Sequence, residues 1–140
     1  MSLGFEEFLA GFPPPVRLLS NYLRELVKRA LPQSTERVIP SWQLIAFYVS
    51  SGLKTVKVGF ILPHPATVSF GFEYGVLLED EQHAMLGAGE RLKRVRYLSY
   101  GTERDVNARE ARRFTKQAAE VALMPSAMRR HLLGLHRSLG

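Results

Sequence analysis

Two stretches near the N-terminus carry apolar residues at the spacing of a helix. The first predicted helix covers residues 5–12, with Ser2 as a candidate N-cap, and the three prolines that begin at Pro13 end it. A longer amphipathic helix is predicted over residues 15–31 and ends at Pro32. Its apolar stripe consists of Val16, Leu19, Tyr22, Leu23, Leu26, Val27 and Ala30.

The middle of the chain changes to the two-residue alternation of β-strands. Four strands are predicted, over residues 44–50, 53–62, 66–74 and 92–100. In the second of them Val56, Val58, Phe60 and Leu62 alternate with Thr55, Lys57, Gly59 and Ile61, which predicts one buried face. Ser51-Gly52 supplies turn residues, so the first three strands should form an antiparallel series.

The chain ends with two further predicted helices. Asn107, with Glu110 three residues later, is a cap signal that opens a helix running to about Met124. Pro125 begins another helix over residues 126–139. A block of strands between helices predicts a single α+β domain over residues 1–140, with an antiparallel sheet of about four to five strands flanked by N-terminal and C-terminal helices.

Composition narrows the kinds of chemistry that the chain can support. Its 140 residues are 46% hydrophobic and 23% charged, as in ordinary globular domains. The absence of cysteine excludes disulfides, thiolate nucleophiles and zinc-thiolate sites. No basic residue precedes the first apolar stretch, and no run reaches the roughly 18 apolar residues of a membrane span. We therefore expect a cytoplasmic protein without a membrane partner.

The net charge of +6 is concentrated in the last third of the chain. Residues 1–90 contain 7 basic and 9 acidic residues, whereas residues 91–140 contain 12 basic and 4 acidic ones. Such a basic region is a candidate surface for nucleic acid, and Tyr97 and Tyr100 lie close enough to stack bases. A solvated helix face explains it more simply, because no nucleic-acid-binding motif is present. The candidate residues are Arg91, Arg94, Arg96, Arg109, Arg112, Arg113 and Lys116.

Several segments, in their order and spacing, resemble one known family. They are Arg37-Val-Ile-Pro-Ser-Trp42, Phe60-Ile-Leu-Pro63, Val68-Ser-Phe-Gly71-Phe72-Glu-Tyr-Gly75, Leu78-Glu-Asp80 and Leu86-Gly87-Ala-Gly89-Glu-Arg-Leu-Lys93-Arg-Val95. Together they are similar to the YdhG-like family of unknown function, over residues 15–122, which leaves a C-terminal helical extension at 125–140. Glu90 stands where that family usually has lysine, and Lys93 where it has arginine. The resemblance implies an iron-chaperone role like that of frataxin, proposed for some members.

An acidic segment supplies candidate metal ligands. Carboxylates and one imidazole within eleven positions suit Fe(II), Mn(II) or Mg(II), and Fe(II) as a cofactor is implied by the family resemblance alone. The spacing fits no standard metal motif, and a solvated acidic loop is the plainer explanation. The residues are Glu73, Glu79, Asp80, Glu81 and His83.

A second group of residues suggests a small-ligand site. Trp42 and Tyr74 carry polar atoms that need partners when buried, which favours them as the mouth of an apolar pocket on the sheet. Glycines allow a ligand to approach the backbone closely, although tight turns explain them equally well. The candidate ligand-binding set is Trp42, Gly71, Tyr74, Gly75, Gly87, Gly89 and Lys93.

No paired catalytic constellation can be assembled from these residues, although Glu90 or Asp80 would suit a general base. The leading hypothesis is a non-enzymatic binding or accessory domain. It would hold a small ligand or a protein partner at the sheet and at the glycine-rich loop around Gly87 and Gly89. The alternatives are iron binding through the acidic loop and nucleic-acid association through the basic region. A homo-oligomer would follow if the first or last helix exposes its apolar stripe.

Overall fold

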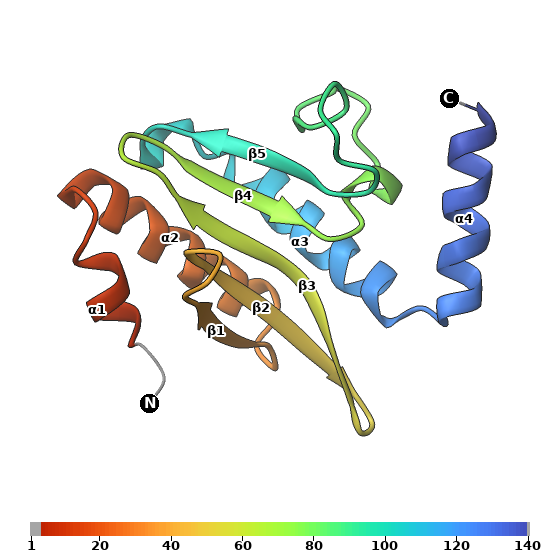
Figure 1. The fold of residues 1–140 in the computed structure, drawn as a ribbon, viewed down its shortest axis with the longest axis horizontal. Coiled ribbons are helices and arrows are strands. Elements are labelled where there is room, and N and C mark those ends of the chain that lie inside the picture. The colour runs from red at the N-terminus through yellow and green to blue at the C-terminus, as the bar shows by residue number, and fades with distance from the viewer. Residues whose placement is uncertain (1–3, 140) are drawn as a thin grey trace.

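The computed structural model describes residues 4–139 and has the α+β architecture expected from the sequence. Within these residues five strands form one sheet in which each strand pairs antiparallel with the next along the chain (Figure 1). The strands are β1 (Thr35–Ile39), β2 (Leu44–Ser51), β3 (Lys54–Pro63), β4 (Val68–Phe72) and β5 (Arg96–Tyr100). The helices are α1 (Phe5–Leu9), α2 (Pro14–Ala30), α3 (Ala108–Leu123) and α4 (Ser126–Leu139), with short 3₁₀ turns η1 (Gly75–Leu77) and η2 (Glu103–Asp105).

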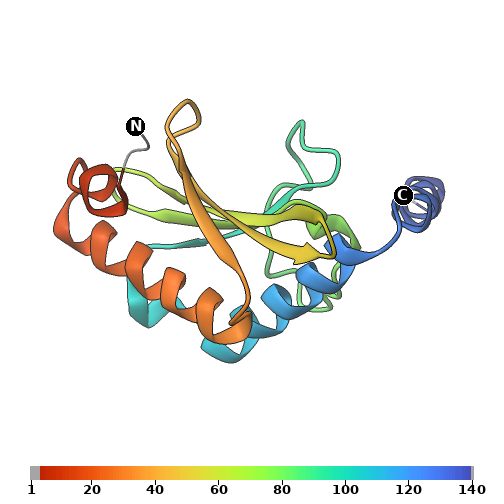
Figure 2. The same ribbon diagram turned by 90° about the horizontal axis from the view of Figure 1, so that it is seen from below.

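The sheet has one covered face and one open face. Figure 2 shows α2 and α3 side by side beneath the sheet, while no helix of residues 4–139 crosses the opposite face. The core lies between the two layers, where Phe47, Phe70, Phe72 and Phe114 form a chain of ring contacts with centroids 4.9 to 6.1 Å apart. Burial of such rings against helices is the main source of stability for a fold of this size.

The helix predictions hold with small changes at the ends. In the short α1, Phe8 and Leu9 are buried in the core. The apolar stripe of α2 also faces the core, as its spacing predicts. The Asn107 side chain accepts a hydrogen bond of 3.1 Å from the Glu110 amide, which confirms the cap of α3. Ser2, the predicted cap of the first helix, lies outside the described residues.

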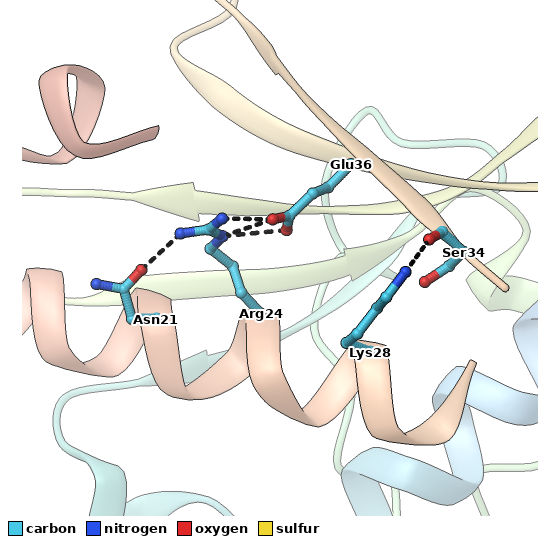
Figure 3. Close-up of polar contacts among 5 residues, drawn as sticks. All are labelled: Asn21, Arg24, Lys28, Ser34 and Glu36. Atoms are coloured by element: carbon cyan, nitrogen blue, oxygen red, sulfur yellow. Dashed lines mark hydrogen bonds and ion pairs between the residues drawn. The ribbon is translucent and has the colours of Figure 1, made fainter. Parts of the chain in front are cut away.

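The connection between α2 and β2 contains a strand that the sequence pattern does not predict. In β1 only Val38 is buried, because the strand lies at the sheet edge and its other residues are polar or partly exposed. Polar contacts fasten it to α2: Arg24 Nε donates to both carboxylate oxygens of Glu36 at 3.0 Å, and Lys28 Nζ donates to the Ser34 carbonyl at 2.6 Å (Figure 3). One ion pair and one hydrogen bond to the backbone therefore connect α2 to an edge that hydrophobic periodicity does not mark.

A bulge in β3 overturns the predicted alternation of that strand. Phe47 pairs with Gly59 and Tyr48 with Lys57, so Val58 has no partner across the ladder. An extra residue in one strand shifts the side chains that precede it to the other face. Val58 is 1% exposed on the helix side, whereas Lys57 is turned to the open face beside Phe60. The prediction that Val56, Val58, Phe60 and Leu62 share one face is therefore wrong.

The fourth predicted strand is shorter than the alternation suggests. Its first residues belong to a loop, and β5 begins only at Arg96. The loop is joined to β5 by a single bridge, in which Leu86 and Tyr97 exchange backbone hydrogen bonds of 2.7 and 3.1 Å. The segment between η1 and β5 is also held to α3 at Glu79, which bonds to Gln117 and Arg113, and its tip rises beside the open face of the sheet (Figure 2).

Candidate functional site

A groove of about 320 Å³ opens where β3 and β4 meet the end of α3 and the start of α4. Its volume falls in the range of small-molecule sites. Two aromatic rings, three cationic side chains and one carboxylate line it, together with two aliphatic residues. The lining residues are Trp42, Val56, Lys57, Glu73, Tyr74, Arg94, Ala122 and Arg129.

Trp42 forms an exposed wall of this groove. It lies in the turn between β1 and β2, where its amide donates to the Ile39 carbonyl at 3.1 Å and Gln43 takes a positive φ of 53°. The turn leaves the indole 64% exposed, a large fraction for a tryptophan. An accessible indole of this kind offers a flat surface on which a planar group can stack.

Lys57 contacts both the Trp42 indole and the carboxylate of Glu73. Its Nζ lies 4.9 Å from the centroid of the Trp42 ring and 2.8 Å from Glu73 Oε1. Both charged side chains are mostly shielded, with 22% and 18% of their surface exposed. The bulge at Val58 makes this pair, because regular alternation would have placed Lys57 in the core with Gly59.

Tyr74 lies between two arginines that come from different parts of the chain. The Arg94 and Arg129 guanidinium carbons are each 5.0 Å from the centroid of the Tyr74 ring, a distance typical of cation–π contact. Arg129 also donates to the carbonyls of Ala122 and Met124 at the end of α3. One ring therefore positions a cation from the glycine-rich loop beside a cation from α4.

The charges of the groove do not cancel. Glu73 neutralises Lys57, while Arg94 and Arg129 face only a neutral ring and backbone carbonyls among their recorded contacts. Two net positive charges beside an exposed indole suit a ligand that combines an anionic group with a planar apolar part.

The structure places only some of the predicted ligand-binding residues in the groove. Trp42 and Tyr74 both line the groove, whereas the glycines have structural roles or none. A Cβ on Gly71 would lie 2.1 Å from Phe60 Cζ, and one on Gly75 would lie 2.5 Å from Arg96 Cβ. Gly87 has a φ of +118°, which favours glycine, and the space around Gly89 is empty within 4 Å.

The end of the glycine-rich loop is organised by Glu90. Tyr97 OH donates a 2.9 Å hydrogen bond to Glu90 Oε2, and this bond, with a smaller contribution from burial, raises the pKa of Tyr97 above its ordinary value. Lys93 is exposed in the same loop and does not line the groove. Glu90 therefore supplies a carboxylate that holds the loop to β5.

The structure does not gather the predicted metal ligands. Glu73 pairs with Lys57, and the Asp80 carboxylate accepts hydrogen bonds from the Ala84 and Met85 amides at 2.8 and 2.9 Å. Among residues 4–139 no three His, Asp or Glu side chains lie close enough together to hold a metal ion. Glu79, Asp80 and Glu81 instead line a polar groove against α3, while His83 takes a positive φ of 53°.

The predicted basic surface is likewise split. Arg109 and Arg113 line the polar groove with the acidic loop, and Arg113 donates to the Glu79 carbonyl at 2.9 Å. Arg96 is partly buried and donates to the carbonyls of Leu92 and Val95. Arg112 lies against α2, and Arg94 belongs to the ligand groove. Arg91 and Lys116 are exposed. The predicted basic residues thus line different grooves or lie outside them.

Two charged residues of the groove, Lys57 and Arg129, were not predicted from the sequence as members of any site. Lys57 belongs to the polar side of the predicted alternation, where nothing marks a site, and Arg129 lies in the last helix, beyond every predicted candidate site. The only sequence signals for this site were their aromatic neighbours, Trp42 beside Lys57 and Tyr74 beside Arg129.

No family model, curated protein or solved structure matches the chain. Across residues 4–139 no helix has the length and apolar character needed to cross a membrane.

Proposed function

We propose that this protein is a binding domain whose site is the groove between Trp42 and Arg94, and that its ligand is a small organic anion with a planar apolar part. One observation carries the proposal. An indole that is 64% exposed stands in the same groove as two guanidiniums that have no carboxylate partner among the described contacts. The planar part would stack on Trp42 and the anion would pair with Arg94 and Arg129.

Trp42 is the only tryptophan of the chain, so its fluorescence reports on this groove alone. We would titrate the protein with phenyl phosphate, which has both a ring and an anion, and compare it with benzyl alcohol and inorganic phosphate, which have one each. We expect saturable quenching by phenyl phosphate with a dissociation constant of about 1 mM, as befits a fragment, and weaker binding of the other two.

The cations of the groove should contribute to that affinity. Arg94→Ala removes a guanidinium from the groove and should weaken phenyl phosphate binding roughly tenfold. Arg91→Ala is the matched control, because it removes the same charge from an exposed position of the same loop that does not line the groove. Equal effects of the two substitutions would mean that only the overall charge matters, and an unquenched Trp42 would refute the proposed site.

The other functions expected from the sequence have less support from the geometry. Iron binding lacks a cluster of ligands among residues 4–139, and the basic residues are spread over separate surfaces. The resemblance to the YdhG-like family remains a prediction, and a non-catalytic binding role is compatible with it.

A further inference from the structure

The last helix leaves an apolar seam uncovered. Met128, Leu132 and Leu135 follow each other at intervals of four and three residues, and the same spacing reaches Leu139 in the sequence. Met128 is 50% and Leu135 48% exposed, while Leu132 is half-buried. The helix stands beside the sheet and touches the body at η1 (Figure 1). A strict four–three spacing is the seam of a coiled coil, narrower than the apolar face of a helix packed on a core.

The charged residues of α4 lie away from this seam. In the heptad defined by Leu132 and Leu135, Arg130 and Arg137 occupy the position opposite the seam, where they face solvent. The nearest flanking positions hold His131 and His136. Arg129, also a flanking residue, is turned to Tyr74 and the end of α3.

This distribution of charge decides which partner fits. An acidic helix would gain little, because the free arginines lie on the far side of α4. A second copy of the same helix meets apolar residues across the seam, and the flanking Arg129 is held away from it by Tyr74 and the end of α3, so like charges do not oppose the pairing. We propose that α4 is a dimerisation helix and that two copies of this protein associate through the seam formed by Met128, Leu132 and Leu135.

The interface should be weak. Two helices of 14 residues bury less than a standard protein interface, so we expect a dissociation constant on the order of 100 µM. Sedimentation equilibrium of the full chain should show a reversible monomer–dimer equilibrium at neutral pH. Monomer alone up to about 1 mM would overturn the proposal.

A pair of variants locates the interface. Met128→Glu together with Leu135→Glu places two charges on the seam and should weaken dimerisation at least tenfold. Arg130→Glu changes the net charge by the same amount on the opposite side of α4 and should leave the dimer intact. Circular dichroism melting would establish that each variant is folded. A dimer that survives the seam substitutions, or that is lost equally in Arg130→Glu, would contradict the proposal.

Discussion

At the scale of single residues, two buried hydroxyls, those of Ser20 and Tyr100, have no hydrogen-bond partner among residues 4–139. Tyr100 is 6% exposed on the helix side of β5, and its OH finds no hydrogen-bond partner among residues 4–139. An unpaired buried hydroxyl costs free energy that a phenylalanine would not. Burial, and then the nearby Glu110 carboxylate, also raise the pKa of Tyr100 above its ordinary value.

Tyr100→Phe should therefore stabilise the protein by up to about 1 kcal/mol at pH 7. The folded state holds the Tyr100 proton more tightly than the unfolded chain does, so this residue's contribution is complete below pH 10 and is lost as the pH rises above that. Urea unfolding at several pH values from 7 to 11 would measure both effects, and the variant should lose less stability than the parent above pH 10.

The matched control is Tyr97→Phe, which removes the hydrogen bond to Glu90 on the partly exposed side of the same strand. It should cost about 0.5 kcal/mol instead of stabilising the protein. If Tyr100→Phe destabilises as much as the control, the Tyr100 hydroxyl has a partner in solution.

At the scale of elements, the glycine-rich loop is a packed segment attached to β5 and not an open cradle. Gly75 lets η1 pass over the backbone of Arg96, since a Cβ there would lie 2.6 Å from the Arg96 nitrogen. Gly89, in the same loop, has free space around it. Two glycines that look equivalent in the sequence thus have different reasons to be present.

Gly75→Ala should destabilise the fold by about 1 to 3 kcal/mol, because backbone atoms must move to admit the methyl group. Gly89→Ala should change the free energy of unfolding by less than about 0.5 kcal/mol. Thermal and urea unfolding of the two variants would separate them, and a tolerated alanine at position 75 would be inconsistent with the close packing of η1 on β5.

Sequence patterns predicted some of these helices and strands and missed others. Elements with a strong hydrophobic period, such as α2 and α3, were predicted almost to their ends. The edge strand β1 was missed because only Val38 of its residues is buried, which leaves no hydrophobic alternation to recognise. The bulge in β3 was missed because an extra residue leaves no mark in the alternation until the partner strand is known.

At the scale of the whole molecule, the fold places the candidate binding groove at one end of a sheet that has one uncovered face. The helices cover one face, and the groove forms where the far end of that layer meets β3 and β4. Its side chains come from four separate parts of the chain, around residues 42, 57, 73–94 and 122–129. The aromatic members were predicted from the sequence, whereas a site assembled from such distant segments requires the structure to reveal its cations.

The most direct test of the groove as a binding site is a titration of the isotope-labelled protein with phenyl phosphate, followed by two-dimensional nitrogen–proton NMR spectra. We predict saturable shifts of the Trp42 indole N–H and of the backbone amides of Glu73, Tyr74 and Arg94, with no change at Arg109 or Arg112. Shifts centred on α3, or none at the Trp42 indole, would contradict the assignment of the groove as the binding site.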